Sequence, residues 1–216
     1  MIECNFYSPE EIKPFYDEIV PAYQSAFAGD PWYEASKCPD LLKRCIGGLS
    51  SIAVGSMCSV CDECPTQPAY EASELIARFE AISATRPTAW YTERTKAGLT
   101  LAAIAWEASA STIAREKYND VTEMSGWLIN KLGSEPVVWL DEVFANRALK
   151  TSGNLARFRA MNTGFMGRLN NTTIAFRTIN ERMIAATKRD YDGQSRVFER
   201  EVAVPDRREF VVINNS

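Results

Sequence analysis

Five of the six cysteines lie close together in the chain, between Cys38 and Cys64. The run Cys58-Ser-Val-Cys61-Asp-Glu-Cys64 contains two overlapping C-x-x-C turns, a spacing that lets two thiolates face one metal ion. With a fourth thiolate from Cys45, or alternatively from Cys38, the expected ligands of a tetrahedral zinc ion are Cys45, Cys58, Cys61 and Cys64. Two alternatives remain open: an iron–sulfur cluster, or small half-buried thiols in an irregular loop, some of them oxidised.

The chain contains no histidine. Ser–His and Cys–His nucleophilic catalysis, a histidine general base and every histidine-containing metal site are therefore excluded. Chemistry must depend on carboxylates, tyrosine, cysteine, backbone amides or a bound cofactor. A net charge of −4 and a pI near 5.1 disfavour a nucleic-acid groove and favour small cationic partners.

A second chemical region combines two carboxylates with a strand-to-helix turn. The strand predicted at 137–146 is apolar except at Asp141 and Glu142, which indicates a central, buried position. Adjacent strand residues face opposite sides, so only one of these two carboxylates is expected to meet a substrate. The helix expected to begin at Gly153 leaves unpaired backbone amides at its start, and such amides bind phosphates.

Helices and strands must position both regions. Ser8-Pro-Glu-Glu11 is a capping box that predicts a helix, and Lys96-Ala-Gly98 is typical of a hairpin turn. The predicted strands are 2–7, 88–95, 99–109, 137–146, 173–178 and a terminal hairpin of 195–204 with 209–213. The predicted helices are 8–27, 69–83, 153–169 and 181–189, and the region 113–132 is expected to be helical in whole or in part. This order predicts an α+β fold, with a mixed, mostly antiparallel central sheet and helices on both faces.

Length and composition suit one globular domain. The 216 residues are 46% hydrophobic and 24% charged, so wholesale disorder is excluded. We expect a single domain over 1–216, with a cysteine-rich irregular insertion at about 36–68. The first residues lack a secretory signal, and the apolar runs are shorter than the ~18–20 residues that span a bilayer. A cytoplasmic protein without membrane or nucleic-acid partners is expected.

Several motifs, in order, resemble the GNAT superfamily of N-acetyltransferases over most of the chain. Lys150-x-x-Gly153-x-Leu155 resembles the family's Q/R-x-x-G-x-G/A, with Lys for Gln/Arg and Leu for the last small residue. Leu140-x-x-Val143-Phe144-Ala145 is similar to its L-x-x-L-Y-V, and Phe176-x-x-x-Asn180 to the fifth strand and following asparagine. Ala26-Phe-Ala-Gly-Asp-Pro-Trp-x-Glu34 is similar to the end of the family's first helix.

The resemblance implies acetyl-CoA-dependent, direct transfer of an acetyl group to a primary amine, on a small molecule or a protein, by a monomer or homodimer. The expected cofactor-binding residues are Val143, Phe144, Ala145, Lys150, Thr151, Ser152, Gly153, Asn154, Leu155 and Asn180. Glu142 or Asp141 is the expected base, and Trp139 replaces a frequent glutamate before them.

One departure from the family affects the general acid. Thr187 occupies the place of a tyrosine that protonates the leaving thiolate, and Tyr191 is the nearest substitute. Tyr191 could equally be a half-buried aromatic. Two other functions remain open: a non-catalytic CoA-binding module, or a cysteine-centred metal or redox protein.

Overall fold

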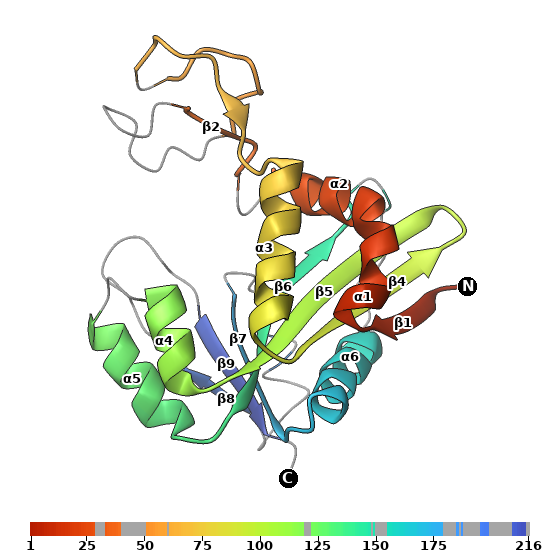
Figure 1. Cartoon of the computed structure of the whole chain (residues 1–216), viewed down its shortest axis with the longest axis vertical. Helices are drawn as coiled ribbons and strands as arrows, with labels where there is room; N and C mark the ends of the chain where they lie inside the picture. Colours follow the sequence, from red (N-terminus) through yellow and green to blue (C-terminus); the bar gives the residue numbers. More distant parts are fainter. Residues whose placement is uncertain are drawn as a thin grey trace.

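The computed structural model describes residues 1–28, 33–39, 51–59, 61–118, 122–147, 149, 155–178, 185, 187, 195–198 and 209–214. Its strands are β1 (Glu3–Tyr7), β2 (Ser36–Lys37), β3 (Gln67–Pro68), β4 (Thr88–Thr95), β5 (Gly98–Ala108), β6 (Val137–Ala145), β7 (Thr173–Thr178), β8 (Ser195–Phe198) and β9 (Glu209–Asn214). Seven of them form one sheet in the order β1-β4-β5-β6-β7-β9-β8 (Figure 1). All its neighbouring strands are antiparallel except β6 and β7, which confirms the predicted α+β class.

The helices are α1 (Pro9–Ile12), the 3-10 turn η1 (Lys13–Phe15), α2 (Tyr16–Phe27), α3 (Ala72–Thr85), α4 (Ala110–Tyr118), α5 (Thr122–Leu132) and α6 (Leu155–Arg168). The capping box is confirmed, since the Ser8 side chain accepts a hydrogen bond from the Glu11 amide and Glu11 accepts one from the Ser8 amide. None of the described helices is long and apolar enough to cross a membrane.

Two of the predicted helical regions are divided in the structure. The first is interrupted by η1, because Pro14 lacks the amide hydrogen that would continue the helical ladder. The region 113–132, expected to be helical in whole or in part, contains two helices, α4 and α5, with Asn119 and Asp120, poor residues for a helix interior, in the sequence between them. Of the helix predicted at 181–189, only residues 185 and 187 are described, and both are helical.

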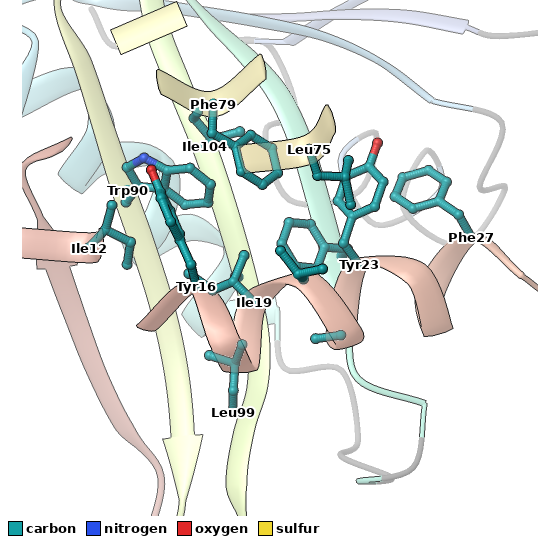
Figure 2. Close-up of a cluster of buried hydrophobic side chains, with 14 residues drawn as sticks. Ile12, Tyr16, Ile19, Tyr23, Phe27, Leu75, Phe79, Trp90, Leu99 and Ile104 are labelled. Atoms are coloured by element: carbon teal, nitrogen blue, oxygen red, sulfur yellow. The ribbon is translucent and has the colours of Figure 1, made fainter. Parts of the chain in front are cut away.

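One face of the sheet carries an aromatic-rich core under α2 and α3 (Figure 2). Phe79 of α3 meets Trp90 of β4 edge-on with ring centroids 4.9 Å apart, and Tyr23 stacks on Phe27 at 4.4 Å. Ile12 and Ile19, which recur in the sequence at helical spacing with Tyr23 and Phe27, are fully buried there. Tyr23 also meets Phe144 edge-on with ring centroids 5.1 Å apart, so this core holds α2 against the carboxyl-terminal half of β6.

The other helices complete both faces. Helix α6 covers the opposite face, where Met161 and Phe165 pack among buried residues of β5, β6 and β7. Helices α4 and α5 pack beside α3 around Trp106 and Trp139. The predicted layers, with helices on both faces of a central sheet, are therefore confirmed.

The segment between α2 and α3 extends beyond the ends of these helices, away from the main sheet (Figure 1). In its described part, β2 and β3 form a short antiparallel pair that joins the two ends of the segment. Between β2 and β3, the described residues 38–39, 51–59 and 61–66 contain no helix or strand, only an isolated bridge between Met57 and Pro65.

Gly164 of α6 tests how tightly α6 packs on the sheet. A Cβ atom at this position would overlap the Phe6 ring of β1. Alanine favours helices over glycine by up to ~1 kcal/mol, but overpacking a core costs about 1–3 kcal/mol, so we expect Gly164→Ala to lower the free energy of unfolding. Urea unfolding measures this.

Gly167 of the same helix provides the matched control. Apart from its chain neighbours and the backbone of its own helix, no described atom lies within 4 Å of the position that its Cβ would take. Gly167→Ala should therefore leave stability unchanged or raise it by up to ~1 kcal/mol. A Gly164→Ala protein as stable as Gly167→Ala would contradict the close packing.

Candidate functional site

Strand β6 contains one extra residue in the middle of the sheet. Glu142 pairs with Ile104 of β5, whereas Leu140 pairs with the next residue of β5, Ala105, so Asp141 has no partner in the ladder. Such a β-bulge bends the strand and increases its twist. On its other edge β6 pairs with β7 at only two described positions, Val138 with Ile174 and Trp139 with Ala175. The two parallel strands therefore diverge at the bulge.

The backbone beyond the bulge faces the opening between these strands. The Asn146 amide donates to the Thr100 carbonyl, and hydrogen-bonded pairs alternate along an antiparallel ladder. Phe144 and Glu142 therefore direct their backbone groups toward β5. Val143 and Ala145 direct theirs away from β5, toward the side where β6 and β7 separate.

Asp141 and Glu142 converge on one arginine. Arg78 of α3 places Nη2 3.2 Å from Asp141 Oδ2 and 2.6 Å from Glu142 Oε1. Lys117 of α4 forms an ion pair with Asp141, and Trp139 Nε1 donates to the same carboxylate at 3.1 Å. Tyr23 of α2 donates its hydroxyl to Glu142 Oε1 at 3.2 Å.

The expectation that the two carboxylates face opposite sides of the strand is wrong. The bulge at Asp141 interrupts the alternation, so Asp141 and Glu142 both lie on the side of α2, α3 and α4. Asp141 is almost completely buried, with 2% of its side chain exposed, whereas 17% of the Glu142 side chain is exposed. Both carboxylates line the same cavity, so both are available to one site.

The surroundings of Asp141 and Glu142 shift the pKa values of the two carboxylates in opposite directions. Burial raises the pKa of Glu142 above its ordinary value; Arg78 opposes this rise and the charge of Asp141 adds to it. Burial also acts to raise the pKa of Asp141, but Lys117 and Arg78 outweigh it and hold that pKa below its ordinary value. Asp141 therefore stays anionic to lower pH than Glu142, and Glu142 is the better proton acceptor.

The cavity beside this cluster has a volume of about 260 Å³. One wall is aromatic, and there the Tyr70 hydroxyl donates to Glu34. Burial raises the pKa of Tyr70, as it does that of Tyr23, so both hydroxyls remain hydrogen-bond donors. The lining residues are Tyr23, Phe27, Glu34, Tyr70, Arg78, Lys117, Leu140, Asp141, Glu142, Val143, Phe176, Arg177 and Thr178. The cavity thus lies where β6 and β7 diverge, between the aromatic wall and the carboxylates.

Only some of the residues expected from the sequence can be placed. Val143 lines the cavity, and Phe144 is buried against α2. Ala145 is the last residue of β6, and Leu155 is the first of α6. Thr187 is completely buried. The remaining expected residues, Cys45, Lys150, Thr151, Ser152, Gly153, Asn154, Asn180 and Tyr191, lie outside the described part of the chain.

Sequence reasoning missed the cations and aromatic rings of the site. Arg78 stands among Leu75, Phe79 and Ile82 on the apolar side of α3, and a charge at such a position was the available signal. In the sequence, Tyr23 is one of several hydrophobic residues at helical spacing, and nothing marks it as part of a site. Nothing in the sequence linked Lys117 to Asp141.

The cysteine cluster lies in the insertion. The Sγ atoms of Cys38, Cys58 and Cys61 all lie within 4.8 Å of one another. Cys64 packs against this group but is not part of the triad. The structure therefore places Cys38, the alternative ligand, with Cys58 and Cys61.

No protein-family model matches the sequence, and no curated protein matches it. Solved structures match along almost its entire length. A mosquito arylalkylamine N-acetyltransferase like 5b is 8% identical with a TM-score of 0.58, covering 99% of this chain and 100% of that one. The Drosophila melanogaster polyamine N-acetyltransferase, which forms N-acetylagmatine, is 8% identical with a TM-score of 0.56 and the same coverage.

An aminoglycoside N-acetyltransferase solved in complex with CoA is also similar. It is 14% identical with a TM-score of 0.50, covering 96% of this chain and 95% of that one. At such identities the likeness establishes a shared fold and leaves activity to be argued from the site.

Arg78 is expected to hold the two carboxylates together. Removing the cation in Arg78→Gln leaves two adjacent anions in a largely buried site. Because the Arg78 side chain is 35% exposed, we expect a loss of about 2–3 kcal/mol of unfolding free energy at neutral pH, less than for a fully buried pair. Denaturant unfolding at several pH values measures this.

The sign of the pH dependence follows from the lost cation. Arg78 lowers the pKa of both carboxylates, so both pKa values rise in the variant. The stability difference should therefore be largest above these raised values and shrink as acid protonates the carboxylates. Glu74→Gln, at an exposed ion pair on the same helix, should change little. An equal effect of the two substitutions would contradict the role of Arg78.

Proposed function

We propose that this chain, which has the fold of the GNAT N-acetyltransferases, transfers an acetyl group from acetyl-CoA to a primary amine by direct attack. The observation that carries the proposal is the divergence of β6 and β7 beside a buried carboxylate. An extended acyl-pantetheine arm can occupy such an opening and hydrogen-bond to the edge of β6, as an added strand does.

The cofactor would be held by backbone groups. Val143 directs its amide toward the opening, where it could polarise the thioester carbonyl and stabilise the oxyanion that forms on it. Phe144 and Ala145 continue the same strand, and Asn180 would contact the pantetheine arm. The turn Lys150–Asn154, with Leu155 at the start of α6, would bind the pyrophosphate through amides at the positive end of the helix dipole.

Glu142 is the proposed general base. An ammonium with a pKa of ~10 must lose a proton before its nitrogen can attack, and a carboxylate with a raised pKa accepts that proton more readily. The nitrogen lone pair then forms a bond to the carbonyl carbon, and collapse of the tetrahedral intermediate breaks the C–S bond. Asp141, held anionic by Lys117, would fix Arg78 and thereby Glu142.

A general acid that protonates the leaving CoA thiolate is less essential than the base. A thiolate with a pKa of ~8.5 is a tolerable leaving group at neutral pH. We propose Tyr191 as the donor, because Thr187 occupies the place of the family's tyrosine and an aliphatic hydroxyl is too weak an acid for this role. The same observation favours a second candidate function, a CoA-binding module that does not catalyse transfer.

The amine site would be the cavity between the carboxylates and the rings of Tyr23, Phe27 and Tyr70. Aromatic faces attract cations, and Glu34 adds a negative charge beside Tyr70. Arylalkylamines, polyamines, aminoglycosides and lysine peptides are therefore the amines to test. A cytoplasmic location would supply acetyl-CoA.

Release of the CoA thiol with this amine panel tests the activity. We expect Glu142→Gln to lower kcat by about 10²–10⁴-fold with CoA affinity unchanged, because the amide cannot accept the proton. Since burial raises the pKa of Glu142, wild-type kcat/KM should fall as pH decreases through a value above 4.5, and the variant should lose this limb. Glu135→Gln, at an exposed position before β6, should behave as wild type.

Two results would contradict the proposed catalysis or the role of Glu142 in it. Stabilisation by CoA without thiol release from acetyl-CoA with any amine would instead support the non-catalytic CoA-binding module. Equal turnover of wild type and Glu142→Gln would remove Glu142 as the base.

The pyrophosphate turn has its own test. Gly153→Val places a branched side chain where phosphates would approach the backbone, so CoA affinity should fall by at least about tenfold, the equivalent of one lost hydrogen bond. Lys150→Ala should have a smaller effect that disappears at high salt, since salt screens the attraction between a lysine and phosphate groups in solvent. Calorimetric titration with CoA measures both, and unchanged affinity in folded Gly153→Val would exclude this turn.

A further inference from the structure

The cysteine-rich segment has almost no apolar core of its own. In its described part the buried apolar side chains are Cys38, Cys58 and Ala69, and the partly buried Cys61 and Cys64 pack against the first two. The centre of the segment is therefore made of thiols. Because small units without a sizeable core usually need a disulfide or a metal, this arrangement requires a further source of stability.

The sulfur geometry suits a metal. The Sγ atoms of Cys38 and Cys61 are 3.8 Å apart, and both lie within 4.8 Å of Cys58 Sγ. A disulfide would bring two sulfurs to about 2.05 Å. Two thiolates on a tetrahedral zinc ion, each bonded at about 2.3 Å, lie about 3.8 Å apart. The observed separation matches the edge of such a tetrahedron.

The backbone folds around these sulfurs. The Asp62 amide donates to the Cys58 carbonyl at 2.8 Å, and the Cys58 amide donates to the Cys64 carbonyl at 2.9 Å. Asp62 adopts a left-handed conformation, with φ of 54°, that lets the chain reverse directly after Cys61. Cys38 lies about twenty residues earlier in the sequence than Cys58, directly after β2. A metal ion would thus join the chain directly after β2 to the turn that contains Cys58 and Cys61.

The cysteine cluster is connected to the proposed amine cavity through β2 and β3. Glu34 precedes β2, and Tyr70 follows β3, so the pair β2–β3 connects both residues to the cysteines. The Ala69 amide donates to the Ala35 carbonyl at 3.2 Å, which ties the two connections together. Glu34 and Tyr70 also line a second cavity of about 400 Å³, together with Val54 and Pro68 of the segment.

We propose that Cys38, Cys58 and Cys61 bind one zinc ion, with a fourth thiolate from Cys64 or Cys45, and that this zinc site fixes the wall of the amine cavity formed by Glu34 and Tyr70. Thiolate ligands select zinc over hard cations such as magnesium and calcium. The metal site itself is independent of the enzymatic proposal; only the effect on amine binding rests on the proposed function.

Metal analysis tests the site without any assay of activity. Protein purified without chelator should contain one zinc per chain, and cobalt(II) substitution should give the visible bands of a tetrahedral, thiolate-bound ion. Cys58→Ser and Cys61→Ser should lower zinc affinity by at least about 10–100-fold. Of Cys64→Ser and Cys45→Ser, the variant that lowers zinc affinity identifies the fourth ligand. Cys4→Ser, at an exposed cysteine on β1, is the matched control and should keep its metal.

Amine kinetics test the connection to the cavity. Removal of zinc by a chelator, or Cys61→Ser, should lower kcat/KM for the amine by on the order of 10–100-fold, because the wall of the site is displaced. CoA affinity should not change, which also shows that the rest of the protein remains folded.

Several results would overturn the proposal. Protein that lacks zinc and gives no thiolate–cobalt spectrum would exclude the site, as would zinc that persists when Cys38, Cys58 and Cys61 are all serine. Detection of iron with acid-labile sulfide would show that the cysteines hold an iron–sulfur cluster and not a zinc ion. Loss of zinc with unchanged amine kinetics would separate the metal from the cavity. Inactivity toward every amine leaves the metal analysis decisive and counts only against the enzymatic proposal.

Discussion

The arrangement of the site depends on one extra residue in a central strand. Asp141 cannot pair with β5, so β6 bends there and leaves its partner β7 after two paired positions. The same bulge turns Asp141 and Glu142 to one side and directs the backbone of Val143 toward the opening. Cavity, carboxylates and unpaired backbone thus have a common origin in the local geometry of β6.

The ion cluster maintains this irregularity. Asp141 contacts Lys117, Arg78 and Trp139 from three different elements, and Arg78 continues to Glu142 and Tyr23. Burying such charges is costly, and an apolar cluster of similar volume would often be at least as stable. We infer that the charges are retained for chemistry, because Lys117 and Arg78 keep Asp141 anionic beside Glu142, whose pKa is raised by burial.

The sequence predicted the features of the fold that depend on local pattern. The capping box at Ser8, the hairpin at Gly98, whose φ of 120° suits glycine, and the strands 88–95 and 173–178 all agree with the structure. Features that depend on contacts between distant residues were not predictable in the same way. No glycine in the sequence indicates the bulge. The assumption that side chains alternate regularly along β6 therefore placed Asp141 and Glu142 on opposite faces, which is wrong. Arg78 and Lys117 reach the site only through packing of α3 and α4, and Cys38 reaches Cys58 only through closure of the insertion.

Hydrogen exchange at individual amides of β6, followed by NMR with and without acetyl-CoA, tests the central claim most directly. Without cofactor, the amides of Glu142 and Phe144 should be protected by β5, and those of Val143 and Ala145 should exchange faster. Acetyl-CoA should then slow exchange at Val143 and Ala145 specifically, because the pantetheine arm pairs with this edge of β6. If acetyl-CoA binds and leaves Val143 and Ala145 unchanged while other amides become protected, the opening between β6 and β7 is not the cofactor site.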